Sequence, residues 1–331
     1  MIQSPNDVEF VIECERLGVD TVWVPEVWGY DATTPLGLLA GKTSSIRLAT
    51  GIVQLGARTP AMLAMQSMSL QMMSGGRFIL GVGSSGPRIM EGWHGVPFSK
   101  PVQLTRETID IVRMIARGDR LQYEGELFQL PPDGFGRSIR SLAPACEPIP
   151  MYVASLGPRN LELPGEIADG WLGNAMMPEA AEAFLEPLRV GCERGGRSLT
   201  DLDLVMPVAV EFTDDVEEAS RRHADGYAFT IGAMGAPGKN FYNRAFAAQG
   251  LGDDVAADVR LPGSPGISSH RAMAQALLLQ QPMTDVGCAG RWQQIVQSEK
   301  ILEPVHQQRR HVVRAARLTG AAAPEPAVLG G

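Results

Sequence analysis

Apolar and polar positions in the first part of the chain follow a helix pattern and then a strand pattern, three times over. The first helix is predicted to begin at Ser4, which can cap it, with Pro5 in the first turn and Asp7 completing a capping box. Each helix leads into a short, almost continuously apolar run, at residues 21–26, 46–53 and 77–83. Apolar runs without alternation are typical of strands buried on both faces, so the pattern predicts a parallel sheet covered by helices.

The same rhythm returns after residue 150, with strands predicted at residues 150–155, 170–176 and 203–212. Repeated βα units leave two candidate folds, a doubly wound sheet and a (β/α)8 barrel. Residues 118–148 show no clear period, so they are predicted to be an insertion between βα units. The tail, residues 255–331, shows no convincing last strand and is predicted to be divergent and partly disordered.

A glycine motif follows the third apolar run. The string Gly81-Val82-Gly83-Ser84-Ser85-Gly86 matches the G-x-G-x-x-G fingerprint of dinucleotide-binding proteins. Such a site needs a helix that opens at the third glycine and an acid about 20 residues further on. Here Gly92, Gly95 and Pro97 prevent a long helix, and residue 103 is a glutamine. The context therefore favours a strand end at the catalytic face of a barrel over an NAD site.

A second candidate loop, Ser155 to Asn160, follows the strand predicted at residues 150–155. It is small and rich in amide groups, it leads into a helix, and it carries Arg159. Backbone N–H groups at a helix N-terminus attract anions, and an arginine beside them strengthens the effect. The loop is predicted to be either an anion site or a plain βα turn with glycine for geometry.

Composition narrows the class of protein. The chain has 331 residues, of which 44% are hydrophobic and 20% charged, as in soluble globular proteins. Its net charge of −8 argues against nucleic acid as the main partner. No apolar run is long enough for a membrane span, and the N-terminus lacks a signal-peptide pattern. The four cysteines form no C-x-x-C pair, so we expect reduced thiols in a cytoplasmic protein.

Five segments together resemble one family. They are GVDTVWVPEVWGYD, IRLATGIVQLGARTP, SGGRFILGVGSSGP, PMYVASLGPRN and GAMGAPGKNFYN. In this order they resemble the bacterial luciferase-like superfamily of flavin and deazaflavin enzymes, above all its actinobacterial branch that uses coenzyme F420. The resemblance covers about residues 6–250. It implies a (β/α)8 TIM barrel with a deazaflavin, or FMN in other branches, across its C-terminal mouth, in a domain of residues 1–254 with the insertion at about 118–148.

The resemblance also implies which residues hold the cofactor. Its ring would rest against a strand-end bulge at Gly51 and Ile52, where relatives often have a non-proline cis peptide bond. Glu26 matches an acidic contact of relatives. The remaining expected contacts lie in two loops, the first beside the cofactor and the second around its phosphate: Gly83, Ser84 and Ser85, then Ser155, Gly157, Pro158, Arg159 and Asn160. In the segment GKNFYN, Lys239, Asn240 and Tyr242 are expected to contact the coenzyme tail, another subunit or solvent.

The implied chemistry is hydride transfer through the deazaflavin C5, helped by a proton donor. Some relatives carry a histidine or a second acid at positions that are Val27 and Gly86 here. The candidate catalytic acids are therefore Glu91 and His94, with a solvated or structural role as the alternative for each. Four aromatic side chains are expected to wall an apolar substrate pocket or to serve in packing: Trp28, Tyr30, Trp93 and Phe98.

The chain also departs from the pattern of its relatives. They begin with a barrel strand before the first helix and end with an eighth strand, so we expect a barrel without strand 1 and with an atypical C-terminal part. The expected function is that of an F420-dependent oxidoreductase, acting as a homodimer on an unidentified small molecule. The alternatives are an FMN-dependent monooxygenase and a truncated, inactive paralogue.

Overall fold

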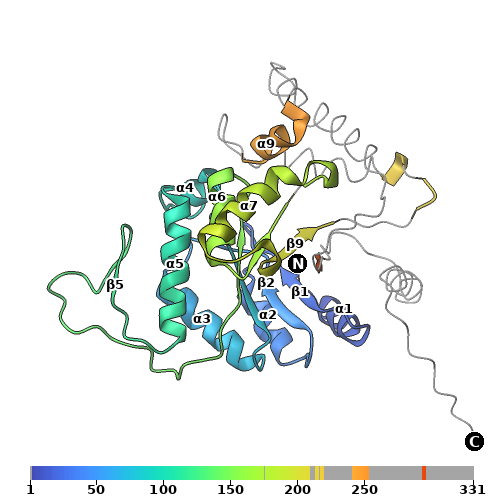
Figure 1. Cartoon of the computed structure of the whole chain (residues 1–331). Helices are drawn as coiled ribbons and strands as arrows, with labels where there is room; N and C mark the ends of the chain where they lie inside the picture. Colours follow the sequence, from blue (N-terminus) through green and yellow to red (C-terminus); the bar gives the residue numbers. More distant parts are fainter. Residues whose placement is uncertain are drawn as a thin grey trace, which may run out of the picture.

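The chain folds around a curved parallel β-sheet (Figure 1). The computed structural model describes residues 2–174, 176–208, 213–215, 217–219, 241–252 and 293–295. The sheet order is β1-β2-β4-β7-β8-β9-β10, with β3 beside β4. The strands are β1 (Thr21–Val24), β2 (Arg47–Thr50), β3 (Val53–Gln54), β4 (Phe78–Gly83), β7 (Met151–Ala154), β8 (Gly170–Leu172), β9 (Asp203–Pro207) and β10 (Gln293–Ile295). Because β10 also lies near β1, the sheet curls back towards its own first strand.

Helices connect these strands and cover the outside of the sheet (Figure 1). They are α1 (Pro5–Arg16), α2 (Thr33–Ala40), α3 (Pro60–Met73), α4 (Pro87–Gly92), α5 (Pro101–Ala116), α6 (Pro158–Ile167), α7 (Glu182–Arg194) and α9 (Phe241–Phe246). Short helical turns occur at Pro178–Ala180, Leu199–Asp201 and Ala247–Leu251. The capping box predicted at Ser4 and Asp7 is present and begins α1 at the predicted place. No helix in the described ranges has both the length and the hydropathy needed to cross a membrane.

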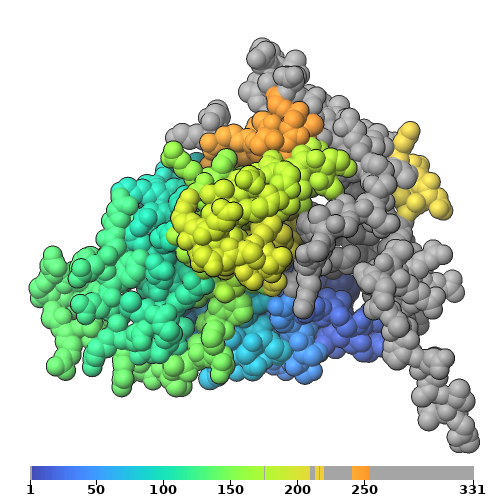
Figure 2. Space-filling view, in the orientation of Figure 1, coloured from blue at the N-terminus to red at the C-terminus, as the bar shows by residue number. Residues whose placement is uncertain are grey.

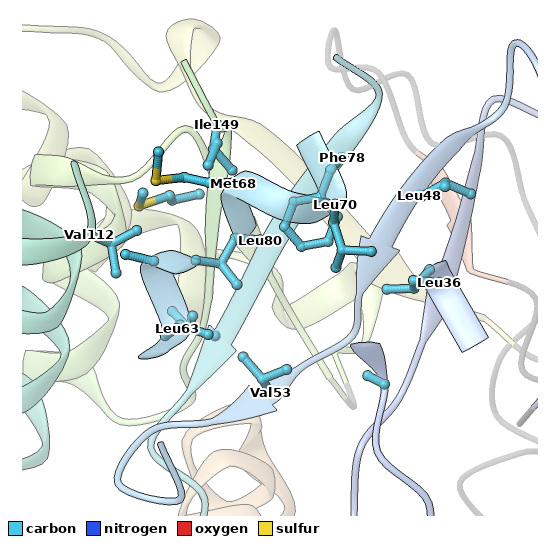
Figure 3. Close-up of a cluster of buried hydrophobic side chains, with 14 of the residues drawn as sticks. Leu36, Leu48, Val53, Leu63, Met68, Leu70, Phe78, Leu80, Val112 and Ile149 are labelled. Atoms are coloured by element: carbon cyan, nitrogen blue, oxygen red, sulfur yellow. The ribbon is translucent and has the colours of Figure 1, made fainter. Parts of the chain in front are cut away.

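Buried apolar side chains fill both sides of the sheet. Between the sheet and the helices lies the large cluster shown in Figure 3, to which β4 contributes Phe78 and Leu80. On the inner side, Ile79 of β4 packs with Trp23 and Tyr152 in a separate cluster. Alternate residues of one strand therefore enter two apolar environments, which explains why the strands read as apolar runs without alternation.

The predicted strand at residues 46–53 is interrupted by a bulge. Ala49 of β2 pairs with Ile79 of β4, whereas Val53 of β3 pairs with Val82. This strand therefore carries one residue more than β4 over the same span, which is the definition of a β-bulge. At the interruption, the Thr50 hydroxyl forms the hydrogen bonds to the β4 backbone. Its Oγ1 donates to the Gly81 carbonyl at 2.8 Å and accepts from the Gly81 N–H at 2.8 Å.

The predicted insertion contains a small antiparallel hairpin, β5 (Tyr123–Glu124) and β6 (Gln129–Leu130), which projects from the side of the barrel (Figure 1). Buried Glu107 of α5 anchors it by accepting hydrogen bonds from the backbone N–H groups of residues 126–128 at 2.7–3.2 Å. Burial opposes ionisation of this carboxyl, but these hydrogen bonds and one from Gln103 lower its pKa.

The tail contains a strand that the sequence did not predict. β10 lies parallel to β9, with Gln293 opposite Val205 and Ile295 opposite Pro207. The expectation that no last strand follows residue 255 is therefore wrong at this point. The other residues from 255 onward lie outside the described residues, as does most of the helix expected after residue 213.

Candidate functional site

The mouth of the sheet, at the carboxyl ends of β1 to β4, brings together several residues that the sequence singled out. The peptide bond between Gly51 and Ile52 is cis, as the resemblance implied. The Ile52 side chain lies over Gly83, because a Cβ atom at Gly83 would be 2.9 Å from Ile52 Cδ1. Glycine at position 83 is therefore needed for the close approach of the bulge, and the two segments form one continuous surface.

Glu26 at the end of β1 is held by protein partners. Its carboxylate forms a bidentate ion pair with Arg58, with both N–O distances at 2.6 Å, and also accepts from the Ala32 N–H at 3.1 Å. The two side chains are 8% and 14% exposed. Sequence reasoning expected Glu26 to contact the cofactor and did not identify Arg58. The structure shows both carboxylate oxygens of Glu26 engaged, so its place in cofactor binding stays a prediction.

A buried glutamine links this ion pair to His94. Gln54 Nε2 donates to the backbone carbonyls of Glu26 at 3.3 Å and Val27 at 3.0 Å. Gln54 Oε1 lies 3.0 Å from His94 Nε2. Gln54 was not identified from the sequence, although it follows the expected bulge by two residues. The structure thus connects one candidate acid, His94, to the ends of β1 and β3.

The other candidate acid holds its own loop together. Exposed Glu91 accepts a hydrogen bond from the Phe98 N–H at 3.2 Å, which closes the segment between α4 and α5. Of the four expected pocket aromatics, Phe98 is half-buried, and its ring packs 6.0 Å from that of Phe241. The side chains of Trp28, Tyr30 and Trp93 are exposed. Their role as walls of a substrate pocket stays a prediction.

The loop after β4 is polar and tightly turned. Ser84 is half-buried, and Ser85 adopts a left-handed conformation with φ of 57°. Gly86 then precedes α4, which has only six residues, as expected from the glycines that follow. Ser84 also borders a small surface hollow whose other walls, among them Met90 and Leu104, are largely apolar. This loop therefore offers backbone and hydroxyl groups beside an apolar surface.

The loop after β7 carries buried polar atoms without partners. Gly83 pairs with Ala154, so the loops that begin at Ser84 and Ser155 leave neighbouring strand ends. Among the described residues, neither Ser155 Oγ nor Asn160 Oδ1 has a hydrogen-bond partner, although both atoms are buried. The ten-residue helix α6 begins here, with Gly157 as its N-cap. The expected phosphate contacts Pro158 and Arg159 lie at the exposed start of this helix.

These orphan atoms fit an anionic ligand. Buried polar groups nearly always have partners, so two without any in one loop indicate a missing ligand or water. Pro158 has no N–H and the Asn160 N–H donates to the Gly157 carbonyl at 2.9 Å, so the Arg159 N–H is the backbone donor that the first turn of α6 can offer to an anion. An asparagine amide presents a donor in place of its oxygen after a half-turn, so Asn160 can also donate to a phosphate. This loop is the place in the described structure that best suits a cofactor phosphate.

Helix α9 lies against the chain near α7 (Figure 2), and its Phe241 ring would be 3.8 Å from a Cβ atom placed on Gly86 in the loop after β4. Phe241 at its start meets Phe98, and Arg244 lies 5.1 Å from the centroid of the Phe241 ring. Burial raises the pKa of Tyr242, opposed by a hydrogen bond with Asn174 after β8. Tyr242 is therefore a packed side chain of α9. The other two residues expected to act with it, Lys239 and Asn240, lie outside the described residues.

Comparisons of the sequence with known proteins find one family and several related oxidoreductases. A sequence model of the luciferase-like monooxygenase family matches residues 5–309. A Mycobacterium tuberculosis protein with the name "Putative coenzyme F420-dependent oxidoreductase Rv3520c" is 39% identical over 74% of this chain and 73% of its own. The 5,10-methylenetetrahydromethanopterin reductase of Methanolobus tindarius is 29% identical over 66% of this chain and 64% of its own.

Solved structures share the fold. The coenzyme F420-dependent tetrahydromethanopterin reductase of Methanopyrus kandleri has a TM-score of 0.66 at 24% identity, covering 83% of this chain and 80% of that one. A riboflavin lyase solved with modified FMN has a TM-score of 0.68 at 14% identity, covering 97% and 86%. The α/β fold and its parallel sheet match luciferase-like TIM-barrel structures, and the family model spans most of the sequence. The chain therefore belongs to the luciferase-like monooxygenase family.

Proposed function

We propose that the protein is a coenzyme F420-dependent oxidoreductase that transfers hydride between the deazaflavin C5 and a small organic substrate. The observation that carries the proposal is a pair of buried polar atoms at the start of α6, Ser155 Oγ and Asn160 Oδ1, which have no hydrogen-bond partner in the described part of the chain. The close approach of the Ile52 side chain to Gly83, on the neighbouring side of the mouth, supports it. So does the 39% identity to a relative named for F420 dependence.

One group of residues would bind the cofactor phosphate, and another would support the cofactor ring. The start of α6, with Ser155, Gly157 and Asn160, would hold the phosphate through N–H and side-chain groups. The Ile52 side chain and the backbone around Gly83 and Ser84 would support one face of the ring. The bound deazaflavin would supply two-electron hydride chemistry at C5. The protein contributes position and exclusion of water, which is its usual share in cofactor enzymes.

An FMN-dependent monooxygenase is the second candidate. One observation favours it, since a fold relative with a TM-score of 0.68 was solved with modified FMN. FMN also carries a phosphate, so the loop after β7 would serve either cofactor. An inactive paralogue would bind neither of them productively.

Titration with F420, followed by the fluorescence of the deazaflavin, is expected to show binding in the micromolar range. Asn160→Ala should weaken it about tenfold, since one hydrogen bond to a charged group contributes about 1.5 kcal/mol. The exposed Asn6→Ala, in the first turn of α1, is the matched control and should bind as the wild type does. Tight FMN binding with oxygen consumption, but no binding of F420, would point to the second candidate. Binding of neither would contradict both.

We also propose that the protein forms a homodimer through α2 and α3. These adjacent helices contain no charged residue. Their exposed apolar side chains are Leu38, Met62, Met65, Met72 and Met73. The buried Gln66 Oε1 on α3 has no hydrogen-bond partner among the described residues. In a twofold dimer the same patch of both copies meets at the interface. Because the α2–α3 face has no charged residue, two copies can meet there without repulsion between like charges. A second copy of this chain therefore suits this face better than a charged partner does.

Placing a charge in this face is expected to break the dimer. Met65 and Met72 are 58% and 74% exposed, so Met65→Glu and Met72→Glu should fold normally and yet elute as monomers. Size-exclusion chromatography with light scattering measures the mass directly. Leu142→Glu, at an exposed apolar residue of the insertion, is the control and should stay dimeric. A monomeric wild-type protein at micromolar concentration would refute the proposal.

A further inference from the structure

We propose that Gln54 is a positioning residue that holds His94 as its Nε2–H tautomer and leaves Nδ1 as the nitrogen that takes up and releases a proton at the mouth. The sequence marks His94 as a candidate acid but does not show which of its ring nitrogens carries the hydrogen. The geometry around Gln54 supplies that assignment. The inference rests on the proposed function only for the use of the proton.

The orientation of the Gln54 amide follows from its surroundings. The side chain is 4% exposed, so its polar atoms must find partners within the protein. On one side lie two backbone carbonyls, of Glu26 at 3.3 Å and Val27 at 3.0 Å. Carbonyl oxygens only accept, so the NH₂ end must face them. The opposite orientation would set three oxygens against one another and leave the NH₂ group facing the imidazole alone.

The tautomer of His94 follows from this orientation. With the amide so fixed, Gln54 Oε1 faces His94 Nε2 at 3.0 Å and can only accept. A neutral imidazole has one N–H, so that hydrogen must be on Nε2 and Nδ1 is left bare. Nδ1 has no hydrogen-bond partner within the part of the chain that the structure describes. A proton added to His94 enters at Nδ1 and gives the imidazolium, while Nε2–H stays on Gln54.

Backbone hydrogen bonds and an ion pair fix the segments that carry Gln54 and His94. On one side, the Leu55 N–H donates to the Gly83 carbonyl at 2.9 Å, and the bidentate Arg58 ion pair fixes Glu26. On the other side, the His94 N–H donates to the Ile89 carbonyl at 3.1 Å. Among the described residues of these segments, the ionisable groups are Glu26 and Arg58, which pair with each other, and Arg88 and Glu91 of α4, which precedes His94. Such outside support is what keeps a functional histidine in one orientation.

Nitrogen-detected tautomer assignment tests this directly. Long-range ¹H–¹⁵N correlation spectra of the uniformly labelled full chain without cofactor, above neutral pH, report which nitrogen carries hydrogen. His94→Asn identifies the His94 signals. We expect a protonated Nε2 whose hydrogen is directly visible, because its hydrogen bond slows exchange with water, and an unprotonated Nδ1.

Gln54→Leu removes the acceptor and should abolish the visible Nε2–H signal. Gln71→Leu is the matched control. Gln71 is also buried and bonded at both ends, to the Pro148 carbonyl and the Phe78 N–H, but it does not contact His94. Its variant should keep the signal despite any loss of stability.

Two results would overturn the inference: hydrogen on Nδ1 in the wild type, or an Nε2–H signal that persists in Gln54→Leu. The wild-type result stands even where Gln54→Leu fails to fold. Neither measurement involves F420, so a failure of cofactor binding leaves this inference intact, and the reverse also holds.

Discussion

Replacing Gly81 by alanine is expected to destabilise the fold by more than about 3 kcal/mol, at the upper end of what overpacking costs. A Cβ atom at this position would lie 2.0 Å from the backbone carbonyl oxygen of Thr50. That oxygen belongs to the β2–β3 bulge and cannot move without breaking the paired hydrogen bonds between Thr50 and Gly81. Urea unfolding followed by circular dichroism would measure the loss, and poor soluble expression is the expected extreme.

The control for this substitution is Gly37→Ala. Gly37 lies inside α2, and a Cβ atom there would meet nothing within 4 Å. Alanine favours a helix over glycine by up to about 1 kcal/mol, so this variant should be as stable as the wild type or more so. A Gly81→Ala protein with the wild-type unfolding midpoint would show that the bulge adapts, against our expectation.

The first glycine of the motif therefore has a structural reason that does not involve phosphate. Gly81 and Gly83 both lie on the inner side of β4, where one admits the Thr50 carbonyl and the other the Ile52 side chain. Both glycines make room for the neighbouring strand. They therefore have a packing role, in place of the dinucleotide-binding role that the sequence context disfavoured.

Replacing Glu26 by glutamine is expected to lower the free energy of unfolding by about 3 kcal/mol, since breaking a buried pair leaves one charge uncompensated. The hydrogen bond from Glu26 raises the pKa of Arg58, but an arginine is charged at neutral pH without such help, so in the variant the guanidinium keeps its charge and loses its carboxylate partner. Thermal or urea unfolding of both proteins would measure the difference. The same change should loosen the backbone carbonyl that orients Gln54.

Glu13→Gln is the matched control for this charge. Glu13 pairs with Arg16 on the exposed side of α1, and pairs of this kind contribute little to stability, so the midpoint should not move. An apolar double variant, Glu26→Leu with Arg58→Met, should recover part of the loss, because it removes both charges together. Equal midpoints for Glu26→Gln and the wild type would contradict the expected coupling.

The elements that the sequence predicted well are those with local signals. The capping box at Ser4 and Asp7 lies within four residues, and the apolar run at 77–83 gives β4 almost to the residue. The break at Gly51 and Ile52 could not be read from residues alone, because every position from Ala49 to Val53 is compatible with a strand. Only the pairing with β4 creates the bulge, and the family resemblance, not the local pattern, pointed to it.

The residues of the candidate site also differ in whether the sequence alone could predict them. The loop Ser155 to Asn160 could be proposed from its glycine and its place before a helix. The partners of Glu26 and His94 could not, because Arg58 is 32 residues from Glu26 and Gln54 is 40 residues from His94 along the chain. β10 was missed for another reason, since the segment around Gln293 lacks the apolar run that identifies the other strands.

The bulge at Gly51 and Ile52 also acts as a phase shift in the strand. Before it, Leu48 belongs to the outer cluster and Ala49 to the inner one; after it, Ile52 packs inward and Val53 outward. Strict alternation from Leu48 would send Ile52 outward and Val53 inward. The bulge absorbs one residue, so that Val53 and Gln54 keep the faces that pairing with β4 requires. Deleting one residue here would let the strand alternate regularly with those faces unchanged, but it would remove the bulge that lays Ile52 over Gly83 at the mouth. The extra residue therefore serves the shape of the mouth, and the regular sheet does not need it.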